Sequence, residues 1–246
     1  MEDTQHPQDN KYFVLIKDLY ILIFFFNTRR MKIGILGTGR VGQTLGGKFS
    51  SGGHQVFMGS RTSGNETARA WAAGNPSAES GTFREAASFG EIIFHCVKGE
   101  VSLEVLEKTG RKNLDGKILV DVTNPLDLSR GMPPSLLICN TESLGERIQE
   151  MLPETRVIKA FNTMNAEVMV NPGLLPGDHD LFICGNDAAT KSWFADFLAE
   201  EIGWKSILDL GDIKSSRGME MILPIWINLY MKFQSGRFNF RVVRGD

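Results

Sequence analysis

Residues 31–62 read MKIGILGTGRVGQTLGGKFSSGGHQVFMGSRT, and this stretch decides the fold. The run over residues 32–36 is short, apolar and β-branched, which is typical of a buried parallel strand. It ends in a G-x-G-x-x-G motif, after which residues 40–50 are predicted to form a helix and residues 55–59 a second strand. A strand, a glycine-rich turn, a helix and a strand in this order indicate a dinucleotide-binding unit.

The glycine-rich turn, which we call the phosphate loop, is Gly37-Thr38-Gly39-Arg40-Val41-Gly42. We expect Gly37 to allow the tight turn out of the strand, Gly39 to let the main chain approach a pyrophosphate, and Gly42 to let the helix pack closely. The peptide N–H groups at the start of the helix would face the phosphates. The alternative is a glycine-rich turn in a related domain that has lost its nucleotide.

The second predicted strand ends in Ser60-Arg61-Thr62, which we call the specificity turn. A domain selective for NAD places an acidic residue here, to bind the ribose 2′-hydroxyl, and none is present. The guanidinium of Arg61 suits a 2′-phosphate, and Ser60 and Thr62 offer hydroxyl donors. The turn therefore favours NADP(H) over NAD, unless Arg61 is simply a solvated surface charge.

The rest of the chain continues the alternation of strands and helices. Further strands are predicted at 91–97, 117–122, 156–161, 180–185 and 204–210, and further helices at 66–73, 100–109, 143–152, 188–201 and 217–233. Repeated β-α-β units without a long linker predict an α/β fold, a single Rossmann-type domain with a doubly wound, mostly parallel sheet and a C-terminal helix. The ligand should lie at the carboxyl ends of the strands, where the strand order switches.

The last predicted helix has one wide apolar face, which contains Met219, Ile222, Leu223, Trp226, Leu229 and Tyr230. Pro224 should kink this helix or lie in its first turn. The apolar face would be either a lid over the core or the surface of a homodimer. Because small Rossmann reductases often complete their sites across a two-fold axis, we favour the homodimer.

Residues 1–30 differ from the rest of the chain. A polar start, an apolar run over residues 12–26 with Lys17 and Asp18 in its middle, and Arg29-Arg30 follow one another. This run is too short and too charged for a confident membrane span and lacks the order of a signal peptide. We therefore expect an extension at 1–30, either non-native, with translation starting at Met31, or a membrane-peripheral anchor, and a reductase domain at 31–246.

The composition is that of an ordinary globular protein. It includes 27 basic and 29 acidic residues, with a formal net charge of −2, which gives no general attraction for nucleic acid or an anionic membrane. Three cysteines, Cys96, Cys139 and Cys184, form no C-x-x-C pair, and we expect buried thiols in a reducing cytoplasm. The four histidines are equally scattered, so no metal site is expected.

Four stretches carry a resemblance to a known family. The run over 31–62, VDVTNP at 120–125, VIKAFNT at 157–163 and DLFICGND at 180–187 resemble the NADPH-dependent reductases of the deazaflavin coenzyme F420. The same module resembles the cytosolic reductase domain of the STEAP ferric reductases. The resemblance extends from Met31 to about Phe233, nearly the whole chain without its extension.

The resemblance implies hydride transfer between the nicotinamide of NADP(H) and a flavin-like acceptor stacked on it, either F420, a flavin or a ferric chelate. Such a reaction needs alignment more than acid–base groups, and we find no catalytic acid, base or nucleophile in the sequence. By position, Val97, Lys98, Thr123, Asn124 and Pro125 should border the cofactor, and Asn162, Thr163 and Met164 should face the acceptor. Asn124-Pro125 also fits an ordinary turn, and Asn162 also fits a helix cap.

One departure and two alternatives remain. The run His95-Cys96-Val97-Lys98-Gly99 replaces the apolar-proline turn that is usual in the family after this strand.

A non-catalytic NADP(H)-binding sensor or scaffold is the alternative to a reductase, since a fold does not guarantee chemistry. Reductases of imines or ketones that resemble pyrroline carboxylate reductase add a long helical dimerisation domain, and the segment after Gly211 is too short for one.

Overall fold

The computed structural model describes residues 30–245. The fold described below is that of the unit Met31–Asp246. The predictions for residues 1–29 therefore lie outside the described residues. Within residues 30–245, no helix combines the length and the apolar character that crossing a lipid bilayer requires.

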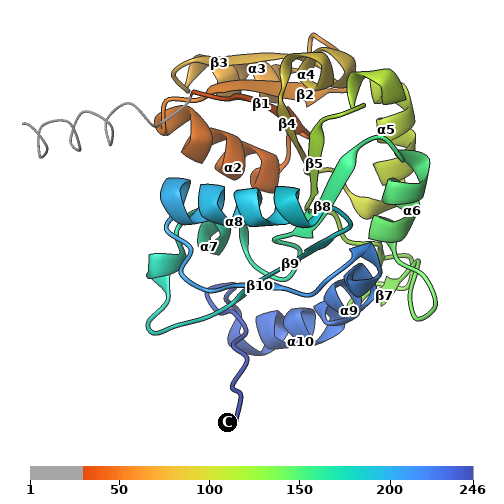
Figure 1. The fold of residues 1–246 in the computed structure, drawn as a ribbon, viewed down its shortest axis with the longest axis vertical. Coiled ribbons are helices and arrows are strands. Elements are labelled where there is room, and N and C mark those ends of the chain that lie inside the picture. Colours follow the sequence, from red (N-terminus) through yellow and green to blue (C-terminus); the bar gives the residue numbers. More distant parts are fainter. Residues whose placement is uncertain (1–29, 246) are drawn as a thin grey trace, which may run out of the picture. The chain divides into compact units, whose positions relative to one another are not determined.

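This unit is built on an eight-stranded sheet with the strand order β10-β9-β8-β5-β4-β1-β2-β3 (Figure 1). Its strands are β1 (Lys32–Leu36), β2 (Gln55–Ser60), β3 (Ala78–Thr82), β4 (Ile92–His95), β5 (Ile118–Asp121), β8 (Arg156–Ala160), β9 (Leu181–Gly185) and β10 (Ile207–Asp209). Strands β6 (Leu126–Asp127) and β7 (Ser135–Leu136) form a separate hairpin. The order switches between β1 and β4, because β2 and β3 follow β1 on one side and β4 lies on the other.

The predicted mostly parallel sheet is confirmed, with one exception. Every neighbouring pair from β3 to β8 is parallel, whereas β9 pairs with β8 antiparallel, with Ala160 opposite Ile183. The α-helix between these two strands, α7 (Ala166–Val170), has five residues and rises about 7.5 Å, too little to return the chain to the other edge. Strand β10 is parallel to β9, so it also runs opposite to β8, and its last residue Asp209 is level with Ala160 at the end of β8.

Helices cover both faces of the sheet and bury one hydrophobic cluster on each (Figure 1). One face packs against α2 (Arg40–Ser51), α3 (Glu66–Ala73), α7 and α8 (Ala188–Glu201). The other packs against α4 (Phe83–Phe89), α5 (Ser102–Thr109), α6 (Leu144–Met151) and α9 (Ser216–Met221), and α10 (Leu223–Phe233) follows α9. This arrangement is the doubly wound architecture that the alternating sequence pattern predicts.

Some local predictions were wrong. Strand β3 and helix α4 were not predicted, because the sequence AESGT has few β-branched residues and its strand rests on pairing with β2. The last predicted helix is two helices that meet at Ile222, with Pro224 in the first turn of α10. On the expected apolar face Tyr230 is exposed. Cys139 is exposed as well, because it lies in the loop after β7 rather than in the sheet, and all three cysteines are free.

Candidate functional site

The phosphate loop leaves β1 in a conformation that only small residues can adopt. Gly37 has φ +121°, and a Cβ there would lie 2.6 Å from the carbonyl oxygen of Cys96. A Cβ on Gly42 would overlap the carbonyl oxygen of Gly37 itself. Gly39 is the N-cap of α2 and has open space above it, with no atom within 4 Å of a Cβ built there. The first turn of α2 can therefore be approached closely by an anion.

Arg40, the first residue of α2, points its guanidinium towards a second helix. It forms an ion pair with Glu167 of α7, and Arg237 lies 3.3 Å from the other oxygen of that carboxylate. All three side chains are at least one-third exposed. Arg40 therefore contributes its backbone to the phosphate loop while its side chain joins α2 to α7.

The specificity turn presents two of its three side chains to solvent. Ser60 is buried, and its hydroxyl donates to the carbonyl oxygens of Thr62 at 2.5 Å and Gly81 at 3.2 Å. Arg61 and Thr62 are exposed, and Arg61 forms no ion pair within residues 30–245. The hydroxyl of Ser60 thus shapes the turn, and the donors available to a ligand are Arg61 and Thr62.

A cavity of about 240 Å³ opens at the carboxyl ends of β4 and β5, beside the start of α2. We call it the crevice. Its lining consists of Val41, Cys96, Val97, Lys98, Gly99, Glu100, Val122, Thr123, Asn124, Leu126 and Leu128. The structure thus brings four of the predicted cofactor-side residues together around one space next to the phosphate loop. The predicted Pro125 is buried and is not among the lining residues.

The crevice floor is held by the turns after β5 and β8. The Asn124 amide donates to the carbonyl oxygen of Asn162 at 2.8 Å, and the Asn162 amide donates to Asn124 Oδ1 at 3.0 Å. The Asn162 amide also donates to the carbonyl oxygen of Met219 on α9 at 2.7 Å. Asn162 does not cap a helix: Asn165 caps α7 instead. The two asparagines therefore lock the β5 turn to the β8 turn and both to α9.

The remaining predicted acceptor-side residues are largely covered. Thr163 is 2% exposed and Met164 is 6% exposed, and Met164 packs in the hydrophobic cluster with Phe161. Phe161 has φ +64°, which is uncommon for a bulky residue and marks a strained point where β8 gives way to the Asn162 turn.

Three fully buried charges lie directly under this floor. Lys159 of β8 donates to Asp121 Oδ2 of β5 at 2.8 Å, to Glu220 Oε1 of α9 at 2.9 Å, and to the carbonyl oxygen of Thr123 at 2.7 Å. Burial works against the Lys159 ammonium, but the carboxylates of Asp121 and Glu220 outweigh burial and raise the pKa of Lys159 above its usual range. We call these three residues the buried triad.

The carboxylates of the buried triad are also satisfied by other donors. Asp121 Oδ1 accepts from the Thr123 amide at 2.9 Å and from the Thr123 hydroxyl at 2.6 Å. Glu220 accepts from the amides of Leu144 at 2.9 Å and Gly145 at 3.0 Å, at the start of α6. The network has one more negative than positive charge, and the amino end of α6 favours that excess.

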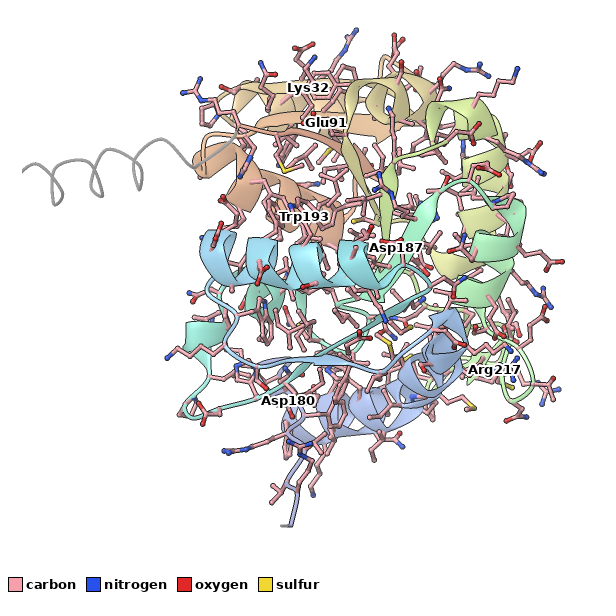
Figure 2. The ribbon with its side chains drawn as sticks, viewed as in Figure 1. Lys32, Glu91, Asp180, Asp187, Trp193 and Arg217 are labelled. Atoms are coloured by element: carbon pink, nitrogen blue, oxygen red, sulfur yellow. The ribbon has the colours of Figure 1, made fainter. Side chains whose placement is uncertain are left out.

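Helix α9 is tied to α6 at the surface as well. Arg217, labelled in Figure 2, donates to both oxygens of Glu146, at 2.8 and 2.5 Å. Beneath the surface, the buried hydroxyls of Ser143 and Ser216 lie 2.6 Å apart. These contacts fix α9, and with it Glu220, against the rest of the unit.

The titratable side chains at the end of β4 are held in neutral form. Burial lowers the pKa of His95 to about 4, and its Nε2 lies 2.7 Å from the Ser102 hydroxyl. Burial also raises the pKa of the Cys96 thiol well above its usual range. An imidazole with a pKa of about 4 is a weak base, and a thiol that stays protonated is a poor nucleophile at neutral pH.

Sequence reasoning missed the buried triad and Gly99. Asp121 and Lys159 interrupt apolar runs, KILVDV and VIKAF, that otherwise predict buried strands. Opposite charges at the ends of two buried parallel strands are a usable signal for a buried ion pair. Glu220 and Gly99 carried no such signal, although a Cβ on Gly99 would overlap the carbonyl oxygen of Asn124.

Comparison with known proteins places this geometry in a family. A family model described as "NADP oxidoreductase coenzyme F420-dependent" matches residues 32–125. An F420-dependent NADP reductase of Methanothermobacter marburgensis is 30% identical over 213 residues, which cover 82% of this chain and 93% of that protein. The chain belongs to this family. A second F420-dependent NADP reductase, from Methanocaldococcus jannaschii, is 30% identical over 160 residues, 65% of this chain and 70% of that protein.

Other similar proteins agree with this placement. Metalloreductase STEAP3 of Rattus norvegicus is 32% identical over 200 residues, 79% of this chain but 38% of that protein. A solved structure described as a putative F420-dependent NADP reductase from Arthrobacter sp. FB24 has a TM-score of 0.82 and 43% identity, over 87% of this chain and 100% of that one. A reductive aminase from Aspergillus terreus, at 18% identity and a TM-score of 0.59, shares the fold.

The F420-dependent NADP reductase family makes this chain an NADP-dependent oxidoreductase. The residues present fit that cofactor. Open space above Gly39 lets a phosphate approach the start of α2. The exposed Arg61 occupies the position at which NAD-selective domains have an acidic residue, which would repel a 2′-phosphate. The crevice continues from the phosphate loop across the switch between β1 and β4, where this fold class holds its ligands.

Proposed function

We propose that this reductase transfers a hydride between NADP(H) and a flavin-like acceptor, and that the acceptor is the deazaflavin F420. A flavin or a ferric chelate is the second choice, because the STEAP relatives are named metalloreductases. The named F420-dependent relatives, which match most of this chain, favour F420. NADPH supplies the hydride when it is bound, and the protein supplies alignment and exclusion of water.

The observation that carries this proposal is the lining of the crevice. Its lining includes the apolar side chains of Val41, Val97 and Leu128, and its uncharged polar residues are Thr123 and Asn124. The charged lining residues Lys98 and Glu100 are both exposed at its rim. A planar aromatic ring suits such walls, whereas a substrate that must be protonated or deprotonated by a side chain does not.

The roles of the chain's own residues follow from their positions. We propose that the amides of the phosphate loop hold the pyrophosphate and that Arg61 and Thr62 hold the 2′-phosphate. Val97, Lys98 and the Thr123-Asn124-Pro125 turn border the nicotinamide side. Asn162, with Thr163 and Met164 behind it, supports the acceptor side through its hydrogen bonds to Asn124.

The test is turnover with defined acceptors. Loss of NADPH absorbance is followed after rapid mixing of the enzyme with NADPH and one of F420, FMN, FAD or a ferric chelate. We expect turnover with F420 to be the fastest by at least about tenfold, since a matched acceptor gains from alignment that the others lack. Turnover of a flavin or ferric chelate alone would overturn the choice of F420. Tight NADPH binding with no turnover of any acceptor would favour a non-catalytic sensor.

We also propose that the protein is a cytoplasmic homodimer that pairs through α10. Ile225, Met231 and Phe233 on this helix are 48, 40 and 56% exposed, and apolar exposure of this extent is typical of an association surface. Sedimentation equilibrium should give a molecular mass twice that of one chain, and the Ile225→Glu variant should have the mass of a single chain. A monomeric wild-type protein at micromolar concentration would contradict the homodimer.

A further inference from the structure

We propose that Lys159 is a positioning residue for the nicotinamide side of the crevice, because its ammonium fixes the carbonyl of Thr123 and thereby the peptide that carries Asn124. This inference rests on the proposed placement of the cofactor. Lys159 itself is fully buried and does not line the crevice. It would act only through the turn above it.

The ammonium of Lys159 has no freedom to move. Each of its three N–H donors has a partner, Asp121 Oδ2, Glu220 Oε1 and the Thr123 carbonyl oxygen, all at 2.7 to 2.9 Å. The two carboxylates come from β5 and from α9, so both a core strand and a C-terminal helix hold the ammonium in place. The Thr123 carbonyl is therefore held by a point that is anchored on three elements.

The triad controls every polar group of Thr123. Its amide and hydroxyl are bound by Asp121 at 2.9 and 2.6 Å, and its carbonyl is bound by Lys159 at 2.7 Å. Asn124, the next residue, precedes a proline, which favours extended backbone. The position of Asn124 on the crevice wall thus depends on where Lys159 holds Thr123.

A second connection runs parallel to the first. Asn162 binds Asn124 and also the carbonyl of Met219, which adjoins Glu220 in α9. The wall turn is therefore connected to α9 both through the two asparagines and through the triad. A rigid wall is what alignment for hydride transfer requires, since small misplacements lower the rate steeply.

A gain in stability does not by itself explain why the chain has this buried ion network. Buried ion pairs contribute no more than well-packed apolar residues of similar volume in many proteins, while the removal of one partner is strongly destabilising. A second buried lysine in this chain shows the contrast. Lys191 of α8 binds Asp209 and the carbonyl of Gly211, both at 2.7 Å, beside the edge strand β10, which β9 and β8 separate from β5.

The test compares Lys159→Met with Lys191→Met, which removes a buried lysine that neither lines the crevice nor contacts the Thr123 turn. Each purified variant is titrated with NADPH and with adenosine 2′,5′-bisphosphate, which lacks the nicotinamide, and the fluorescence of bound NADPH is recorded. We expect Lys159→Met to bind adenosine 2′,5′-bisphosphate like the wild type, to bind NADPH more weakly, and to shift the fluorescence towards that of free NADPH. Lys191→Met should match the wild type in all three.

Turnover adds a second readout. With F420 as acceptor, kcat of Lys159→Met should fall by about 10²-fold while KM changes little. If the wild type does not reduce F420, the acceptor assignment fails, but the binding and fluorescence results still decide the role of Lys159. Wild-type fluorescence in Lys159→Met, or an equal loss of affinity for both nucleotides, would overturn the inference.

Lys159→Met leaves two buried carboxylates without their cation and so risks failing to fold. The variant Asp121→Asn/Lys159→Met/Glu220→Gln removes all three charges and keeps side chains of similar size. It is tested in the same way. It should show the same loss of nicotinamide-side binding with a native circular dichroism spectrum. If this neutral variant binds NADPH like the wild type, Lys159 has no positioning role.

Discussion

The two sides of the site are built differently. The nucleotide side, residues 37–42 and 60–62, depends mainly on the backbone conformation of the turn from β1 into α2, although Gly37 also packs against the distant Cys96 carbonyl. The nicotinamide side depends on contacts between residues far apart, such as Asn124 with Asn162, 38 positions away, and Leu144 with Glu220, 76 positions away. We therefore propose that local chemistry determines where a dinucleotide binds and that long-range packing determines what reacts with it.

This difference separates binding from turnover. A change in the phosphate loop should weaken NADPH and NADH alike, because both contain the pyrophosphate. A change in the buried triad should leave the adenosine half bound and misplace the nicotinamide half. Substitutions on the two sides are therefore expected to give distinct patterns rather than graded versions of one defect.

The largest effect is expected from Gly37→Ala. A Cβ at φ +121° is strained and would lie 2.6 Å from the Cys96 carbonyl oxygen, so the phosphate loop must shift. NADPH and NADH should both lose affinity by on the order of 10²-fold, with their ratio unchanged, in a fluorescence titration. The control Gly47→Ala lies in the same α2 helix, where a Cβ meets only a side-chain oxygen at 3.3 Å, and it should bind like the wild type. A changed NADPH to NADH ratio in Gly37→Ala would contradict the local account.

Much of the nucleotide side could be predicted from the sequence. The phosphate loop, the strand that precedes it and the helix that follows are recognisable because glycine spacing and apolar runs act over a few residues. Residues 60–62 do lie at the end of β2 as expected, whereas the hydrogen bond from Ser60 to Gly81 of β3 could not be predicted locally.

The nicotinamide side was predictable only in outline. The resemblance to F420 reductases pointed to Asn124 and Asn162, but not to their mutual hydrogen bonds. Lys159 and Asp121 stood out only as charges in apolar strands, and nothing near Glu220 in the sequence indicates that it completes the network. The antiparallel direction of β9 was equally hidden, because a strand's direction is set by the path of its connection and not by its own residues.

The central claim, that Arg61 in the specificity turn makes this a site for a 2′-phosphorylated dinucleotide, is tested most directly by calorimetric titration of the wild type and Arg61→Asp with NADPH and NADH. Arg69→Asp makes the same change of charge at another exposed arginine and serves as the control. The account predicts that Arg61→Asp lowers NADPH affinity by on the order of 10²-fold or more and leaves NADH affinity unchanged or improved. Equal losses for the two nucleotides, or a wild type that binds neither, would contradict it.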